Sequence, residues 1–327
     1  MERQRLSLVQ RAMLFFLVLV LVGLFQSGLG DRNGVSARTI KFASDPEFFA
    51  DPNGMAAFQE EYEFQFDVVY QMVIGLTHEA LRASDVDAAM GYPTDGRIER
   101  LQLVTLDDDR EFFSNSYVAP VIREQVLETY PEIEHILAEL AVKLDKETMV
   151  SFNYLIELED HDVYELADRW LDEQVFFDEP SRVLHDGDAV RVGGSDFGEP
   201  RILGVITILL LESRGIPTDD HTLPVLFGPS RDRMLAGDLD LYFECSRTSL
   251  RTQDDELKFS EYSGEEVFAE VALRDEEKGL VWLDYPPFSN RRAILMRKEH
   301  AEELGITTMT EFAAWVNETQ DGQSEDE

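Results

Sequence analysis

The chain has 327 residues, of which 66 are Asp or Glu and 29 are Lys or Arg, so its formal net charge is -37. Because 44% of the residues are hydrophobic, including 21 Phe, the chain can bury a core, which excludes a disordered acidic protein. It has no basic patch to release counterions, which excludes nucleic acid as a partner. The acidic, lysine-poor composition favours a halophilic protein over an ordinary acidic one, since concentrated salt screens like-charge repulsion.

Residues 1–37 are predicted to be a signal peptide or a membrane anchor. Three arginines precede an unbroken apolar run of 14 residues, Ala12–Phe25, which is short for a transmembrane helix and typical of a signal-peptide core. Uncharged residues continue to Gly30, so an uncleaved anchor in the cytoplasmic membrane stays open. In both cases the basic end stays inside, and the rest is expected to be exported to a periplasmic or extracytoplasmic space.

Strands and helices alternate twice along the rest of the chain. In the first half, strands are predicted at 39–44, 63–70 and 85–92, a helix at 73–84, and further helices at 121–144, 146–158 and 162–174. Turn residues then indicate a linker at 174–189. In the second half, strands are predicted at 189–194, 221–227, 238–245, 280–285 and 291–297, and helices at 200–215, 230–237, 264–279 and 311–318. This alternation predicts an α/β fold with mainly parallel sheets.

Several segments between Arg38 and Val316 together resemble one protein family. These segments are "PEFFADPNG", "YPTDGRIERLQLVTLDDDREFF", "APVIREQVLETYPEIEHILAELAVKLDKETMVSFNY", "VGGSDFGEPRILG", "AGDLDLYFECSRTSL" and "FSNRRAILMRKEHAEELGITTMTEF". They are similar to motifs of the substrate-binding proteins of ABC transporters for glycine betaine, choline and carnitine. The resemblance implies a two-lobed periplasmic-binding-protein-like fold of type II. It also implies a small-molecule ligand between the lobes, ABC permease and ATPase subunits as partners, and no cofactor.

The order of these segments is exchanged relative to the family, which predicts a circular permutation. In the family, the segment that is similar to this chain from Val190 onward comes first. The segment that is similar to this chain from Thr39 onward comes second there, after the helix that corresponds to the one near residue 316. Exposed connections tolerate such rearrangement. By analogy with the family, lobe B would comprise residues 38–123 and 286–316. Lobe A would comprise residues 124–285, including the linker, and residues 317–327 would be a disordered acidic tail.

The resemblance also implies which residues face the ligand. Tyr92 matches an aromatic residue of the family's cage for a quaternary ammonium. Three other cage tyrosines fall on Ser116 (next to Tyr117), Cys245 and Arg292. The carboxylate-binding lysine and arginine fall on Ser195 and Asp51, whereas Thr248 matches a threonine that is kept. The candidate ligand-binding set is Asp51, Tyr92, Thr94, Ser116, Tyr117, Ser195, Cys245, Thr248, Asn290, Arg291 and Arg292.

These replacements leave three hypotheses for the ligand. In the first, the ligand has changed: Arg291 and Arg292 hold an anionic group and Asp51 holds an amine. In the second, a betaine-like ligand is held differently. In the third, no small ligand binds, because Arg292 pairs with an acid such as Asp51 or Glu244.

Other functions have little support in the sequence. The six histidines show no metal-ligand spacing, and no nucleophile elbow or Walker lysine is present, so neither a metal site nor an enzyme is predicted. The single cysteine, Cys245, excludes a disulfide within the chain. The main prediction is therefore an exported solute receptor of an ABC transporter. The alternative is a membrane-tethered sensory or regulatory domain with a remodelled or vestigial ligand site.

Overall fold

The computed structural model describes residues 38–113, 115–176, 187–194, 198–223, 229–254 and 262–321. The predicted signal peptide or anchor at 1–37, the candidate residue Ser195 and most of the predicted linker lie outside these residues. The chain from Thr39 onward forms one compact unit. Within the ranges given, no helix combines the length and the apolar character that a membrane span requires.

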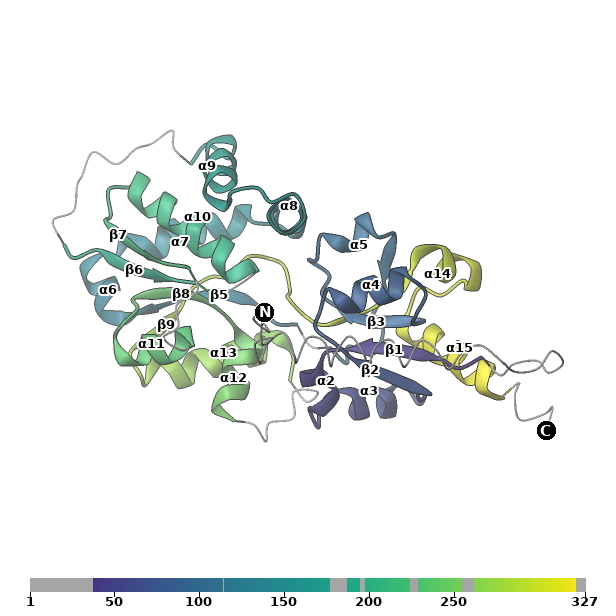
Figure 1. The fold of residues 1–327 in the computed structure, drawn as a ribbon. Coiled ribbons are helices and arrows are strands. Elements are labelled where there is room, and N and C mark those ends of the chain that lie inside the picture. Colours follow the sequence, from purple (N-terminus) through teal and green to yellow (C-terminus); the bar gives the residue numbers. More distant parts are fainter. Residues whose placement is uncertain are drawn as a thin grey trace, which may run out of the picture. The chain divides into compact units, whose positions relative to one another are not determined.

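The first of two five-stranded sheets has the order β2-β1-β3-β10-β4 (Figure 1). Its strands are β1 Lys41–Ser44, β2 Val68–Gln71, β3 Ala88–Gly91, β4 Leu103–Thr105 and β10 Ala293–Arg297. Strand β1 pairs in parallel with β2 and β3, and β10 pairs antiparallel with β3 and β4. The helices of this part are α2 Pro46–Ala50, α3 Met55–Glu61, α4 Leu76–Arg82, α5 Arg97–Arg100, α14 Lys298–Leu304 and α15 Met309–Asp321. Early and late segments of the chain therefore share one sheet.

The second sheet has the order β7-β6-β8-β5-β9. Its strands are β5 Val118–Arg123, β6 Val190–Gly193, β7 Thr218–His221, β8 Leu241–Cys245 and β9 Leu280–Trp282. Strand β6 pairs in parallel with β7 and β8, and β5 pairs antiparallel with β8 and β9. The helices are α6 Glu124–Thr129, α7 Glu132–Lys143, α8 Lys146–Glu157, α9 Val163–Glu173, α10 Glu199–Ser213, α11 Ser230–Ala236, α12 Ser246–Gln253 and α13 Gly264–Glu276. The predicted α/β class is thus confirmed, but the sheets are mixed rather than mainly parallel, since each has two parallel and two antiparallel pairings.

Strand β5 corrects two predictions. Residues 121–123 were expected to begin a helix, and the boundary between the lobes was placed after Arg123. Instead Val118–Arg123 is an inner strand of the second sheet, between β8 and β9. Its first five residues are apolar and buried, and three of them are β-branched, which suits a strand that is buried on both faces. The second sheet therefore begins at Val118.

Other segments also differ from the prediction, and helices α2, α3, α5 and α14 and strand β4 were not predicted. Strand β7 is Thr218–His221 rather than 221–227, and residues 224–227 of the expected strand lie outside the described ranges. Helix α12 was not predicted, and it begins directly after β8. Strand β7 was not predicted at these residues because the prediction looked for apolar side chains. The side chains of β7 are polar and at least partly exposed.

The two connections between the sheets contact each other. The backbone N–H of Ser116 donates to Ser289 Oγ at 3.0 Å, and the backbone N–H of Asn290 donates to the carbonyl of Ser116 at 2.9 Å. The segment that leads from the first sheet to the second therefore lies beside the segment that leads back.

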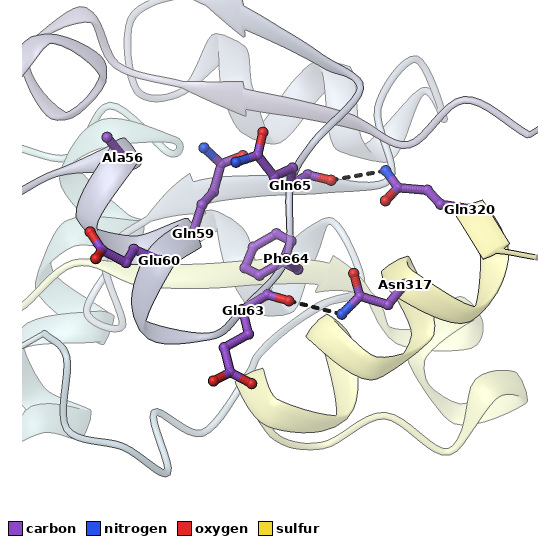
Figure 2. A pocket seen from close by; sticks show the side chains of 8 residues that line it. All are labelled: Ala56, Gln59, Glu60, Glu63, Phe64, Gln65, Asn317 and Gln320. Carbon is purple, nitrogen blue, oxygen red and sulfur yellow. Dashed lines mark hydrogen bonds between the residues drawn. The ribbon is translucent and has the colours of Figure 1, made fainter.

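The last helix extends into the predicted disordered tail, so the prediction for residues 317–321 is wrong. Asn317 Nδ2 donates to the carbonyl of Glu63, and Gln320 Nε2 donates to the carbonyl of Gln65, both at 2.9 Å (Figure 2). These bonds border a surface pocket of about 540 Å³. The side-chain amides anchor the end of α15 to a backbone segment far away in the sequence, which local composition does not reveal.

Candidate functional site

The candidate residues lie mainly on the segments that follow parallel strands. Strands β1, β3, β6 and β8 end at Ser44, Gly91, Gly193 and Cys245. Ligands of open α/β sheets bind beyond the carboxyl ends of such strands. The segments that follow β1, β3 and β8 carry Asp45, Tyr92 and Arg247, respectively.

Helix α2 presents three acidic side chains next to one another. Asp45 is its N-cap, and Oδ1 of Asp45 accepts the backbone N–H of Phe48 at 2.8 Å. Glu47 lies in the first turn, and Asp51 follows four residues later at the end of the helix. Because residues four apart share a helix face, Glu47 and Asp51 can reach the same partner.

Helix α12 supplies that partner. Arg247 and Arg251 are also four residues apart. Arg251 Nη1 lies 3.2 Å from Asp51 Oδ2, and its Nη2 is paired with Glu47. This interaction joins a helix that follows the second sheet to a helix that follows the first.

Arg292, which precedes β10, completes the group. Its Nη2 lies 3.6 Å from Asp45 Oδ1 and 3.4 Å from Glu47 Oε1, and its guanidinium lies over the ring of Phe48 at 5.5 Å. Under the third ligand hypothesis the acid was expected to be Asp51 or Glu244, but the acids found are Asp45 and Glu47. We refer to Asp45, Glu47, Asp51, Arg247, Arg251 and Arg292 as the cation–acid cluster.

Burial and charge shift the pKa values in this cluster. Burial, followed by repulsion from Arg292, lowers the pKa of Arg247 to about 10. Burial acts to raise the pKa of Glu47, but Arg292 and Arg251 outweigh it, and the pKa lies below its usual value. Burial raises the pKa of Tyr92, although Arg292 opposes this. Tyr92 therefore stays a neutral phenol beside the cluster.

Sequence reasoning missed Arg247 and Arg251. Arg247 lies between Cys245 and Thr248, two positions that the resemblance already places at the ligand, so a large cation between them was the available signal. Arg251 had no comparable signal, because its role depends on where α12 points.

The structure places the other candidates differently. Arg291 Nη1 is 3.9 Å from Asp108 Oδ2, outside the cluster. Tyr117 stacks on Tyr285 with ring centroids 4.1 Å apart and donates to Glu265. Thr248 is exposed on α12. Of the candidate residues, Asp51 and Arg292 therefore belong to the cluster, and Tyr92 lies beside it.

A second polar group surrounds Glu199, the first residue of α10, which is only 4% exposed. Asn290 Nδ2 donates to Glu199 Oε2 at 2.7 Å, and Asn153 Nδ2 lies 3.3 Å from Glu199 Oε1. Asn153 Nδ2 also donates to the carbonyl of Thr94 at 2.9 Å. The candidates Thr94 and Asn290 thus meet at a buried carboxyl that sequence reasoning did not single out.

Cys245 is the last residue of β8, and burial, followed by the charges of Glu244 and Glu199, raises the pKa of its thiol. A thiol with a raised pKa is a poor nucleophile, which agrees with a packing role. Among the described residues, no group of His, Cys, Asp and Glu has a metal-binding arrangement.

Glu199 provides a test of this electrostatic description. Burial raises its pKa, although bonds from Thr94, Asn153 and Asn290 oppose the shift. The folded protein therefore binds this proton more tightly than the unfolded chain, whose Glu has a pKa of about 4.3. We expect the wild-type protein to lose stability relative to Glu199→Gln as the pH rises above that value through the raised pKa. Melting temperatures between pH 4 and 8 would show this.

The matched control is Glu147→Gln, which removes one exposed carboxylate from α8. A constant difference between the wild type and Glu199→Gln across the pH range would contradict the raised pKa.

The pairing of Arg251 with Glu47 and Asp51 is expected to be sensitive to salt. The Arg251 side chain is 28% exposed, so Arg251→Ala should lower the free energy of unfolding by about 1 kcal/mol or less at low salt. The loss should shrink in molar salt because the Debye length falls to about 3 Å. Urea denaturation at the two salt concentrations measures both values.

The control is Arg274→Ala, whose pair with Glu270 lies within α13. An Arg251→Ala loss that stays constant with salt would mean that packing, rather than ion pairing, explains the effect.

Comparison with known proteins identifies the family. The substrate binding domain of ABC-type glycine betaine transport systems matches residues 27–173 and 188–325. The chain belongs to this family. The predicted resemblance is therefore confirmed, and the two sheets with their helices fit its α/β periplasmic-binding-protein-like fold. Members of this family bind solutes for transport, which agrees with the prediction that the chain is not an enzyme.

Individual relatives match parts of the chain. A glycine-betaine-binding protein of Pseudomonas aeruginosa is 32% identical over 156 residues, covering 47% of this chain and 48% of that protein. A carnitine transport binding protein of Listeria monocytogenes is 34% identical over 102 residues, covering 31% and 33%. A crystal structure of a glycine betaine/carnitine/choline ABC transporter is 26% identical, covers 43% of this chain and 52% of that chain, and has a TM-score of 0.37. The chain thus spans less than half of the length of these two curated relatives.

Proposed function

We propose that this chain is the extracytoplasmic solute-binding component of an ABC uptake transporter of the glycine betaine, choline and osmoprotectant type. It would deliver a small polar solute to permease and ATPase subunits. The observation that carries this proposal is the match of the family to both segments, 27–173 and 188–325. The same match favours a transport component over the membrane-tethered sensory domain.

The solute would bind between two lobes, one built on each sheet. Lobe B would contain β1–β4 and β10, and lobe A would contain β5–β9. The contacts of Arg251 with Asp51, and of Asn153 with the carbonyl of Thr94, support this proposal. A ligand that contacts both lobes only when they are closed would shift the population toward the closed state.

We further propose that the chain is a circular permutant of the family. Two observations support this. The family matches in two segments on either side of residues 174–187, where the linker is predicted. In addition, Asp67 accepts from the backbone N–H of Ile40 at 2.6 Å and from Gln320 Nε2 at 3.1 Å. The start of β1 and the end of α15 therefore share one partner, so a short connection would join them in the family order.

A reordered chain tests the permutation. It would start at Gly187, run to Asp321, continue through a short Gly/Ser linker into Arg38 and end at Phe176. We expect it to fold with the same circular dichroism spectrum and to bind the same solutes. Failure of this chain to fold, while the original order folds, would contradict the proposal.

The proposal that the protein is exported is based on its N-terminal segment. The proposal that it is adapted to high salt is based on its net charge of -37. Residues 1–37 would act as a signal peptide or keep the protein anchored to the cytoplasmic membrane. Cell fractionation, together with the mass of the mature N-terminus, distinguishes these two cases. A melting temperature that does not rise with salt would contradict the halophilic interpretation.

A thermal-shift screen of the full chain in molar salt tests the main function. The panel contains glycine betaine, choline, carnitine, ectoine, amino acids and small dicarboxylates. Saturable stabilisation by one of these solutes is expected, because a ligand that binds only the folded state raises the melting temperature. No stabilisation by any member of the panel would count against a solute-binding function.

A further inference from the structure

Two buried polar atoms of the cation–acid cluster need opposite kinds of partner. Within the described part of the chain, Asp45 Oδ2 and Arg292 Nε are buried and have no hydrogen-bond partner. Asp45 is only 9% exposed. The Asp45 oxygen is an acceptor that needs a donor, and the Arg292 nitrogen is a donor that needs an acceptor. Buried polar groups of this kind are normally satisfied.

The ion pairs of Arg292 leave some of its N–H donors available for a ligand. Its N–O distances to Asp45 and Glu47 are 3.6 and 3.4 Å, longer than charge-assisted hydrogen bonds of about 2.7–2.9 Å. A guanidinium has five N–H donors, and two of them can hold one carboxylate in a fork. Arg247 is close enough to Arg292 for the two cations to repel each other, and an anion beside both would relieve that repulsion.

The cluster also offers acceptors for a cation that carries N–H groups. Asp45 Oδ2 is one. In the neighbouring group around Glu199, Asn290 Oδ1, two residues from Arg292 in the sequence, is another buried acceptor without a partner in the described chain. The amide of Asn290 is oriented by the bond from its Nδ2 to Glu199. Acceptors of this kind favour an ammonium group that donates hydrogen bonds.

A trimethylammonium group fits these surroundings less well. It has no N–H, so it would leave Asp45 Oδ2 without a donor. The face of Phe48, which could attract such a cation, already lies under the guanidinium of Arg292. Tyr92 is the remaining ring of the candidate set beside the cluster.

We propose that the cation–acid cluster binds an amino-acid-like zwitterion, with its carboxylate on Arg292 and its N–H-bearing ammonium on Asp45. This inference rests on the proposed solute-binding function and specifies the class of solute. A primary or secondary amine of an amino acid satisfies both orphan atoms at once. A fully N-methylated betaine satisfies only Arg292.

Calorimetric titration of the full chain with matched pairs tests the inference. Each pair is a free amino acid and its fully N-methylated betaine, methylated at the α-nitrogen: glycine with glycine betaine, and likewise for alanine, proline, glutamate and lysine. Choline is added as a cation without a carboxylate. We expect at least one free amino acid to bind about ten-fold or more tightly than its methylated partner, because a buried charged acceptor loses its donor in the latter.

The outcomes separate the inference from the function on which it rests. Tighter or equal binding of the methylated partners, or of choline, overturns the zwitterion assignment and leaves a solute-binding function in place. No binding of any of these compounds, or of the wider panel of the thermal-shift screen, overturns both. Binding confined to solutes of that panel without an amine also overturns the assignment.

Asp45→Asn assigns the effect to this side chain. Asparagine is an equally good N-cap, so helix α2 should persist, but the charge and one acceptor are lost. We expect the preference for the free amino acid to fall toward equality with its methylated partner. The matched control is Asp145→Asn, which makes the same change at the exposed N-cap of α8, where Oδ1 accepts from Thr148 N at 2.8 Å. An unchanged preference in Asp45→Asn overturns the assignment of the amine to Asp45.

Discussion

Replacing Asp275 with Ala is expected to lower the free energy of unfolding by about 3–5 kcal/mol, because it leaves a buried cation without its partner. Asp275 is fully buried on α13. It accepts hydrogen bonds from Arg231 Nη1 and Nη2 at 2.9 and 2.6 Å, from Trp282 Nε1 at 2.9 Å and from Lys278 Nζ at 3.0 Å. One carboxylate thus joins α11, α13 and β9.

The pKa of Asp275 indicates the same stabilisation. Burial acts to raise this pKa, but the bonds from Arg231, Trp282 and Lys278 outweigh burial, and the pKa lies below its usual value. The contribution to stability is therefore present above the ordinary carboxyl pKa of about 3.9 and is lost as the pH falls through the lowered value. Urea denaturation at neutral pH measures the full effect.

The control is Asp172→Ala, which removes an exposed carboxylate from α9. The double variant Asp275→Ala/Arg231→Ala should lose less than the sum of the two single variants, because each single change already breaks the pair. A loss below about 1 kcal/mol for Asp275→Ala, the range of an exposed ion pair, would mean that the carboxylate is not the anchor described here.

Replacing Phe58 with Ala is expected to lower the free energy of unfolding by about 3–5 kcal/mol, since it opens a cavity in an aromatic core. Phe58 is fully buried on α3. Its ring lies 5.3–6.4 Å, between centroids, from five other aromatic rings. These rings belong to Phe48, Tyr62, Phe64, Phe112 and Phe113. Urea denaturation followed by circular dichroism measures the loss.

Phe49→Ala is the control, because Phe49 lies on the neighbouring helix α2 and is 42% exposed. An equal loss in both variants would contradict a specific aromatic core. Phe48 links this core to the candidate site, since it contacts Phe58 and lies under Arg292. Ligand affinity should therefore weaken in Phe58→Ala and stay unchanged in Phe49→Ala.

Local patterns were enough to predict much of the fold. Strands β1, β3, β6 and β8 all fall in predicted strands, and all of α10 except its first residue falls in a predicted helix. Short apolar runs next to amphipathic or turn-rich segments depend on near neighbours in the chain, so they can be recognised without tertiary structure. Family motifs in the sequence also drew attention to Asp51, Tyr92 and Arg292.

Partners far apart in the sequence could not be predicted in this way. Strand β5 is a strand because β8 and β9 flank it, although the following residues suggested a helix. Arg251 meets Glu47 and Asp51 across about 200 residues of chain.

The sequence by itself determined the family, the α/β class and the acidic character of this protein, because these depend on composition, periodicity and motifs. The tertiary structure alone decided which acid pairs with which arginine, and that Glu199 is buried. Electrostatic pairing and burial depend on distances between segments that only the folded chain brings together.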